Sequence, residues 1–225
     1  FRAEVDLVKI RHELANIWAI HRMKLILGIE DKKETENFYN QLLSYLTKDF
    51  SKNGSIDNKS LLNQIDSFQS NGKKIFYYDD TADDWAIPLN KLFGSKNIEC
   101  INALNITQET FIERIKKEKP GCVLLDLRLK NEKEVLEVLE YSGGQLLLAI
   151  KKQFITLPVI MFTATNKAES VRRLLAAGAD YVWTKEGIDD GLNDLRTLDS
   201  VTNLLSEVDK ALSKFKNKHY EEIYE

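Results

Sequence analysis

Four short apolar runs of the sequence each end on polar side chains that could handle a phosphoryl group. They deliver two adjacent carboxylates, a single carboxylate, a hydroxyl and an amine: Asp79-Asp80, Asp126, Thr163 and Lys185. Three carboxylates in one cleft repel one another unless a hard cation lies among them, and Mg²⁺ suits a site with few carboxylates and several waters. A nearby lysine and hydroxyl can bind phosphoryl oxygens. These residue types indicate in-line attack by Asp126 on phosphorus, which gives an acyl phosphate.

The run that leads to Asp126 is the most strand-like of the four. Its sequence is Gly121-Cys-Val-Leu-Leu-Asp126, with Pro120 before it and charged residues after it. A run this apolar indicates a strand buried on both faces, as in a parallel sheet. Open α/β sheets bind ligands at the carboxyl ends of their strands. Each polar residue also has a plainer explanation, as a turn, a strand residue or a surface lysine, and their recurrence at four strand ends favours a common site.

From residue 73 onward, strand patterns alternate with helix patterns. The expected strands are 74–79, 98–103, 122–126, 158–162 and 180–184, and the expected helices are 84–93, 108–117, 144–153, 168–177 and 197–216. A charged insertion at 127–141 interrupts the series. This alternation predicts an α/β fold with a five-stranded, doubly wound parallel sheet. Right-handed crossovers then place all carboxyl ends of the strands on one rim.

The first seventy residues have a helical texture instead. Residues 3–30 form one long helical pattern that is apolar on more than one side, and a second helix is expected at 33–50. A short helix at 59–68 follows. We therefore expect a helical hairpin over residues 1–70 and an α/β domain over residues 73–218. Because two helices alone cannot bury apolar surface on several sides, the hairpin is expected to form a homodimer.

The composition is that of an ordinary globular protein. The chain has 225 residues, of which 43% are apolar and 30% charged, and its net charge is −3. This charge gives no basic field for nucleic acid or a membrane surface, and no apolar run reaches the roughly 20 residues of a membrane span. Cys100 and Cys122 are expected to be free thiols of a cytoplasmic protein. The chain begins at Phe1 and shows no signal peptide, which leaves open whether sequence precedes it.

Four motifs together resemble the receiver domain of two-component response regulators. They are Ile75-Phe-Tyr-Tyr-Asp-Asp80, Val123-Leu-Leu-Asp126, Pro158-Val-Ile-Met-Phe-Thr-Ala164 and Gly178-Ala-Asp-Tyr-Val-Trp-Thr-Lys185. The resemblance covers the chain from Lys73 to Lys216. It implies a flavodoxin-like domain with the strand order 2-1-3-4-5.

The resemblance also implies a role for each residue of the rim. Asp126 would be the phosphoacceptor, and Thr163 and Lys185 would bind the phosphoryl oxygens. The Mg²⁺ ligands that it implies are the carboxylates of Asp79, Asp80 and Asp126 and the backbone carbonyl of Arg128. A cognate histidine kinase or phosphotransfer protein would be the partner that supplies the phosphoryl group.

Three features of this sequence depart from the usual receiver pattern. Glu186 follows the lysine, where the family usually has proline. Val182 stands at the usual aromatic switch position, with Tyr181 one residue earlier. The loop after Asp126 is longer than usual and extends to about Ser142. These departures leave the phosphorylation residues in place but remove the aromatic residue that usually couples the threonine to an output surface.

The segment Arg11-His12-Glu13-Leu14-Ala15-Asn16 resembles the H-box of histidine-kinase dimerisation and phosphotransfer helices. His12 lies roughly opposite the main apolar stripe, and Glu13 could take a proton from its imidazole. Glu13 and Asn16 share a helix face, and their acid-x-x-Asn spacing resembles the one used in such helices to position water for phosphatase activity. The alternative is a surface histidine on a dimerising helix.

The sequence lacks the motifs that several other functions require. The sequence has no Gly-rich nucleotide loop, no kinase catalytic domain and no helix-turn-helix, so neither ATP-dependent phosphorylation of histidine nor direct DNA binding is supported. We expect a two-component phosphorelay protein; a receiver-like docking or dimerisation module with little phosphorylation is the alternative. A haloacid-dehalogenase-type phosphatase is disfavoured, because Arg128 stands where that family needs a second aspartate.

Overall fold

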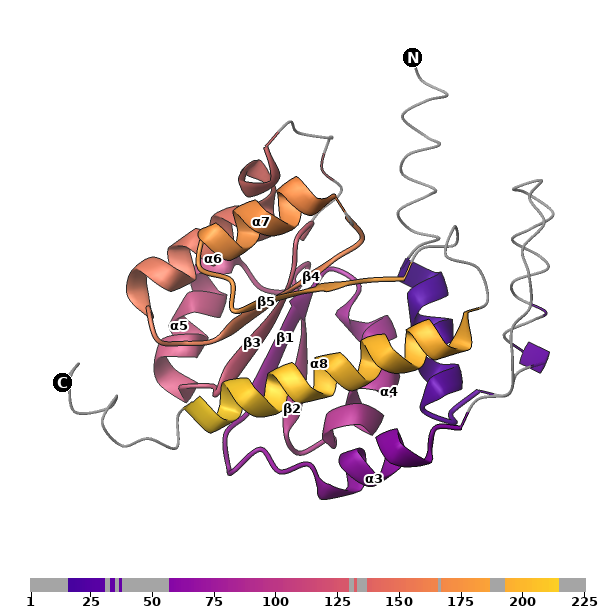
Figure 1. The fold of residues 1–225 in the computed structure, drawn as a ribbon. Coiled ribbons are helices and arrows are strands. Elements are labelled where there is room, and N and C mark those ends of the chain that lie inside the picture. The colour runs from indigo at the N-terminus through magenta and orange to yellow at the C-terminus, as the bar shows by residue number, and fades with distance from the viewer. Residues whose placement is uncertain are drawn as a thin grey trace, which may run out of the picture.

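The centre of the protein is a five-stranded parallel sheet with helices on both faces (Figure 1). A computed structural model describes residues 16–30, 33–34, 37, 57–129, 132, 137–165, 167–186 and 193–214. The strand order is β2-β1-β3-β4-β5, with every neighbouring pair parallel. The predicted fold class and the predicted strand order 2-1-3-4-5 are therefore confirmed.

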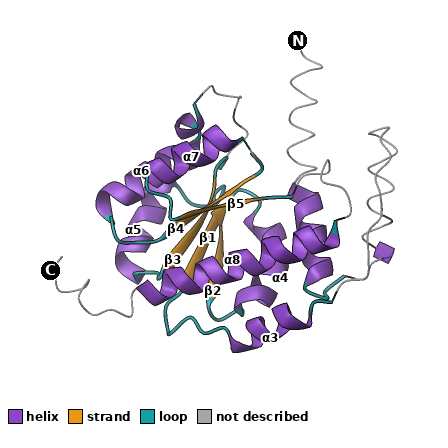
Figure 2. Cartoon of the chain, viewed as in Figure 1, coloured by secondary structure: helices purple, strands orange, loops and turns teal. Residues whose placement is uncertain are grey.

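Strands and helices alternate through most of the described chain (Figure 2). The strands are β1 (Ile75–Asp79), β2 (Ile98–Asn102), β3 (Cys122–Asp126), β4 (Val159–Thr163) and β5 (Tyr181–Thr184). The helices are α3 (Lys59–Ser67), α4 (Ala82–Phe93), α5 (Gln108–Glu118), the 3₁₀ turn η1 (Val138–Glu140), α6 (Ser142–Gln153), α7 (Ala168–Ala176) and α8 (Asp194–Lys214). A further helix over residues 16–26 precedes them, and we call it the N-terminal helix.

The sheet separates two apolar cores, because side chains alternate between its faces. In β1, Ile75 and Tyr77 pack with α3, α4, α8 and the N-terminal helix, whereas Phe76 and Tyr78 pack with α5, α6 and α7. All five residues of β1, β3 and β4 are buried, as expected for central parallel strands. Cys100 and Cys122 are free thiols in β2 and β3.

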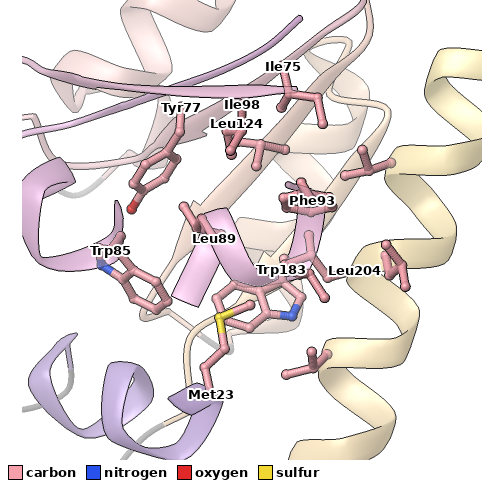
Figure 3. Close-up of a cluster of buried hydrophobic side chains, with 14 of the residues drawn as sticks. Met23, Ile75, Tyr77, Trp85, Leu89, Phe93, Ile98, Leu124, Trp183 and Leu204 are labelled. Atoms are coloured by element: carbon pink, nitrogen blue, oxygen red, sulfur yellow. The ribbon is translucent and has the colours of Figure 1, made fainter. Parts of the chain in front are cut away.

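The N-terminal helix belongs to the core under α4 and α8. Met23 packs in the same cluster as Trp183 of β5 and Leu204 of α8 (Figure 3). Ile17, in the first turn of the same helix, is 41% exposed. The α4 and α8 helices of the same chain thus cover apolar surface for which we expected a dimer partner.

The predicted division into a hairpin over 1–70 and a receiver over 73–218 stays a prediction. Nearly all of the expected second helix at 33–50 lies outside the described residues. What the structure adds is that α3 and the N-terminal helix contribute Leu61 and Ile26 to the core of the α/β domain.

Truncation of Met23 tests this packing. Met23→Ala should lower the free energy of unfolding by about 2–5 kcal/mol, because it removes a fully buried side chain from a shared core. Ile17→Ala, on the exposed side of the same helix, should cost less than about 1 kcal/mol. Urea unfolding measures both. Equal losses for the two variants would show that the helix is not docked as described.

Candidate functional site

Strand alternation aims three charged side chains to one side of the sheet. In β1, β3 and β5, the residues two positions before Asp79, Asp126 and Lys185 all pack in the core under α4 and α8. Side chains two apart in a strand share a face, so these three groups project together at the carboxyl ends. Thr163 follows Phe162, which belongs to that same core, and its side chain therefore starts from the opposite face.

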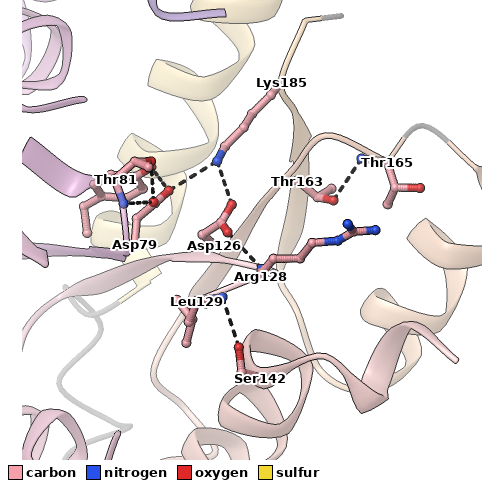
Figure 4. Close-up of polar contacts among 10 residues, drawn as sticks. Asp79, Thr81, Asp126, Arg128, Leu129, Ser142, Thr163, Thr165 and Lys185 are labelled. Carbon is pink, nitrogen blue, oxygen red and sulfur yellow. Dashed lines mark hydrogen bonds and ion pairs between the residues drawn. The ribbon is translucent and has the colours of Figure 1, made fainter. Parts of the chain in front are cut away.

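Lys185 lies between two of the carboxylates (Figure 4). Its Nζ is 2.6 Å from Asp126 Oδ1 and 3.2 Å from Asp79 Oδ2, and all three side chains are buried. The same Nζ lies 5.4 Å from the ring centroid of Trp85. The backbone N–H of Lys185 donates to the carbonyl oxygen of Thr163 at 2.7 Å, which continues the β4–β5 pairing up to the lysine.

Asp79 is held by four hydrogen-bond donors. Its Oδ1 accepts from the backbone N–H and the hydroxyl of Thr81, at 2.6 and 2.7 Å. Its Oδ2 accepts from the Tyr77 hydroxyl and from Lys185 Nζ. A carboxylate with this many partners is fixed in orientation and stays ionised.

Asp126 is fixed by the lysine on one oxygen and by the backbone on the other. The N–H of Arg128 donates to Asp126 Oδ2 at 2.8 Å. The Arg128 guanidinium points away from the carboxylates (Figure 4), donates to the Tyr141 hydroxyl at 2.7 Å and lies 4.4 Å from that ring's centroid. Arg128 therefore contributes its backbone to the site, and its side chain points elsewhere.

The start of α6 supports the strand end that carries Asp126. Ser142 Oγ accepts a hydrogen bond from the Leu129 N–H at 3.0 Å, and the Gly143 N–H donates to the carbonyl of Leu127 at 3.0 Å. A Cβ on Gly143 would overlap the backbone carbonyl oxygen of Asp126. Only glycine permits this approach, so the long insertion returns to the site at a defined point.

Asp80 completes a cluster of three carboxylates. Asp79, Asp80 and Asp126 each offer an oxygen, and these oxygens lie within 4.8 Å of one another. Lys185 is their one buried cationic partner among the contacts described here, so the ionised cluster keeps an excess of negative charge. A small set of hard oxygen ligands with excess negative charge fits Mg²⁺.

The electrostatics of the cluster follow from burial and from mutual repulsion. Burial, reinforced by the charges of Asp79 and Asp126, raises the pKa of Asp80 to about 7. Burial likewise raises the pKa of Asp126 to about 6, although Lys185 opposes the shift. Burial also disfavours ionised Asp79, but Lys185, Thr81 and Tyr77 outweigh it and hold that pKa below its ordinary value. Two of the three acids therefore titrate near neutrality.

An aromatic cluster forms the apolar base of the site. Trp85 packs edge-on against Phe162 and Trp183, with ring centroids 6.0 and 5.9 Å away, and Tyr77 lies 5.2 Å from Phe162. These rings exclude water below the carboxylates, which strengthens both the ion pairs and the repulsion above them.

The structure brings together four of the predicted residues in one cluster. Asp79, Asp80, Asp126 and Lys185 converge as expected from their strand ends. The Thr163 hydroxyl lies at the same rim, but it accepts from the Thr165 N–H at 3.0 Å (Figure 4).

The predicted H-box falls mostly beyond the described part of the chain. His12 and Glu13 lie outside the described residues. Asn16, the first residue of the N-terminal helix that is described, is 7% exposed. The roles expected for these three residues stay predictions.

Three supporting residues were not predicted from the sequence. Tyr77 is two residues before Asp79 in the same strand, so strand alternation could have identified it. Thr81 follows Asp79 by two residues, a spacing typical of an aspartate that binds the backbone of its own turn. Trp85, beside Lys185, lies one helical turn further along and carries no comparable signal.

The usual aromatic position at the edge strand has an aliphatic residue here. Val182 packs in the core under α6 and α7, whereas Tyr181 packs against the core under α8. Because neighbours in a strand face opposite sides, Tyr181 cannot take the place of an aromatic residue at position 182.

Comparisons with known proteins agree with this geometry. The model of the response regulator receiver domain matches residues 80–196, which is more than half of the chain. The protein therefore belongs to the response regulator receiver domain family, and this membership assigns it to two-component signalling. Comparison with curated protein sequences gave no match.

Solved structures similar to the chain include two receiver domains. A CheY-like response regulator receiver domain protein from Methanospirillum hungatei is 24% identical, with 61% of this chain and 97% of that chain covered and a TM-score of 0.41. The receiver domain of NtrX from Brucella abortus is 25% identical, with 56% and 98% covered and a TM-score of 0.38. Within the described part of the chain, no helix has the length and apolarity that crossing a membrane requires.

Because the pKa of Asp80 is raised, replacing this carboxyl by a neutral amide should stabilise the fold by an amount that depends on pH. Between about pH 4 and pH 7 the folded state binds a proton that the unfolded state has lost, so stability falls as pH rises through this range. Asp80→Asn should therefore melt above wild type at about pH 8 in EDTA, and the gap should shrink toward about pH 5. Asp66→Asn, on the exposed surface of α3, controls for loss of a surface charge. A gap that does not change with pH would contradict the prediction.

Proposed function

We propose that this receiver accepts a phosphoryl group on Asp126, with Mg²⁺ held by Asp79, Asp80, Asp126 and the backbone carbonyl of Arg128. The observation that carries the proposal is the cluster of three carboxylates within 4.8 Å with Lys185 bound to two of them. A scaffold with no phosphoryl chemistry gains nothing from holding these acids together against their repulsion.

The transfer follows from the contacts of Asp126. A carboxylate oxygen forms a bond to phosphorus while the bond from phosphorus to the leaving group breaks, and an acyl phosphate results. The Arg128 N–H holds Oδ2, which restricts rotation of the carboxylate. When bound, Mg²⁺ neutralises charge that develops on the phosphoryl oxygens. Asp79 would provide a carboxylate ligand whose orientation is fixed by its bonds with Thr81 and Tyr77.

Lys185 and Thr163 are proposed to bind the incoming group. Lys185 Nζ is 2.6 Å from Asp126 Oδ1, so a phosphoryl group on this carboxylate would lie within its reach. Burial lowers the pKa of the lysine, but Asp126 and Asp79 outweigh burial and raise it, so the amine stays cationic. The Thr163 hydroxyl accepts from the Thr165 N–H through a lone pair, so its own proton could be donated to a phosphoryl oxygen.

The phosphoryl group is proposed to come from a partner. Receiver domains interact with histidine kinases or phosphotransfer proteins, and we propose one of these as the donor. Transfer by His12 and homodimerisation through the N-terminal helices stay predictions. The alternative proposal, a docking module with little phosphorylation, is favoured by Val182 at the switch position.

Intact mass spectrometry after incubation with acetyl phosphate and Mg²⁺ tests the assignment. Wild type should gain one phosphoryl group, and Asp126→Asn should gain none, because the amide cannot form the acyl phosphate. Asp66→Asn should react like wild type, which excludes labelling of surface carboxylates in general. A phosphoryl group on folded Asp126→Asn would contradict the assignment, and no gain in wild type would favour the docking module.

Mg²⁺ affinity should rise steeply with pH. The cation competes with protons on Asp80 and Asp126, whose pKa values are raised to about 7 and about 6, so binding should strengthen from about pH 5 to about pH 8. Titration followed by tryptophan fluorescence measures this, because Trp85 lies beside Lys185. Asp80→Asn should weaken binding at the higher pH and flatten the dependence. Affinity independent of pH would argue against these ligands.

A further inference from the structure

A second buried ionic cluster lies directly beyond Lys185. The fully buried Arg22 of the N-terminal helix lies with its Nη2 2.7 Å from Asp194 Oδ1 and 2.9 Å from Thr197 Oγ1. Its Nε is 3.5 Å from Glu186 Oε1, and the Thr197 hydroxyl donates to Glu186 Oε2 at 2.6 Å. The guanidinium also lies 5.5 Å from the ring centroid of Trp18. Neither carboxylate is more than 9% exposed.

A cluster of this kind has a high desolvation cost. A buried arginine that is enclosed with two carboxylates need not stabilise the fold, because apolar residues of similar volume in the same place often give equal or greater stability. The planar guanidinium, with several donors in fixed directions, is instead suited to holding several partners in one arrangement. The partners of Arg22 therefore indicate what it holds in place.

Those partners flank the segment that connects β5 to α8. Glu186 immediately follows Lys185, whereas Asp194 and Thr197 belong to the first turns of α8. Arg22 thus contacts residues on both sides of positions 187–192 in the sequence. The backbone of Lys185 is bonded on its other side to Thr163 of β4. The lysine is therefore fixed between a strand pairing and the Arg22 cluster.

We propose that Arg22 is a positioning residue for the phosphoryl-accepting site. Through Glu186 and the start of α8, it holds the chain at Lys185 so that the amine stays between Asp79 and Asp126. The N-terminal helix is then part of the structure that maintains the site, although none of its described residues belongs to the carboxylate cluster. The positioning claim stands on the unphosphorylated protein, and only its effect on transfer rests on the proposed function.

Amine labelling measures the position of Lys185 without any phosphorylation. The full chain is treated briefly with an acetylating reagent well below its melting temperature, and acetylation of each lysine is quantified by peptide mass spectrometry. Lys151 is the internal reference, because its Nζ binds Asp180 Oδ2 at 2.8 Å and the Leu157 carbonyl at 2.7 Å on the α6 side of the sheet. The ratio of Lys185 to Lys151 labelling reports local release of Lys185 and cancels general loosening.

Arg22→Met should raise this ratio by about fivefold or more, a typical size for coupling between sites. Glu186→Gln, which keeps the contacts of Arg22 with Asp194 and Thr197, should raise it in the same direction and serves if Arg22→Met fails to fold. Arg22→Lys, which keeps the charge, should restore part of the protection. The matched control is Arg114→Met, since Arg114 of α5, on the other face of the sheet, binds Glu99 of β2 and Glu118 of α5.

Unchanged ratios in folded Arg22→Met and Glu186→Gln would overturn the proposal, and so would an equal rise in Arg114→Met. The rate of phosphorylation by acetyl phosphate at saturating Mg²⁺ is the second readout. It should fall in Arg22→Met, recover partly in Arg22→Lys and stay unchanged in Arg114→Met. If wild type takes no phosphoryl group, the proposed function fails, while the labelling ratios still decide the role of Arg22.

Discussion

The buried amine of Lys185 is the group on which the acidic rim depends. Desolvation disfavours both the amine and the carboxylates of Asp79 and Asp126. The amine stabilises each carboxylate as an ion, and the two carboxylates, which repel each other, together keep the amine charged. The aromatic rings below make this mutual dependence stronger, because they replace water with a medium of low polarity. One positive charge against three acids leaves the ionised site short of a cation, which is the electrostatic condition for binding a divalent metal.

Most of the α/β domain could be predicted from the sequence because its central strands carry a strong signal. The bounds of β3 are those expected, since five consecutive buried positions between a proline-glycine pair and a charged loop leave little choice. The starts of helices were predicted less accurately where no side chain caps the first turn. Thr107 caps α5 by accepting from the Thr110 N–H, and that helix begins at residue 108 as expected. In contrast, α4 and α6 begin two residues earlier than expected and have no side-chain cap bond.

The candidate site was predictable to the extent that it depends on strand ends. Because the strands are parallel, Asp79, Asp126 and Lys185 lie on one rim irrespective of the conformation of the loops. Their convergence therefore follows from the order of the strands. The orientation of the Thr163 hydroxyl depends on one local bond and could not be read from a pattern. The Arg22 cluster joins residues up to 175 positions apart, and a single sequence carries no signal for such a pairing.

The shared core of the N-terminal helix has a consequence for solubility. A receiver released from this helix would present to water the side chains of α4 and α8 on which Met23 and Ile26 now lie, together with the carboxylates of Glu186 and Asp194 without their arginine. A contiguous apolar area of this kind promotes self-association. The helix therefore also shields this apolar side of the domain from intermolecular contacts. Proteolytic removal of the helix would yield an aggregation-prone fragment rather than an independent soluble domain.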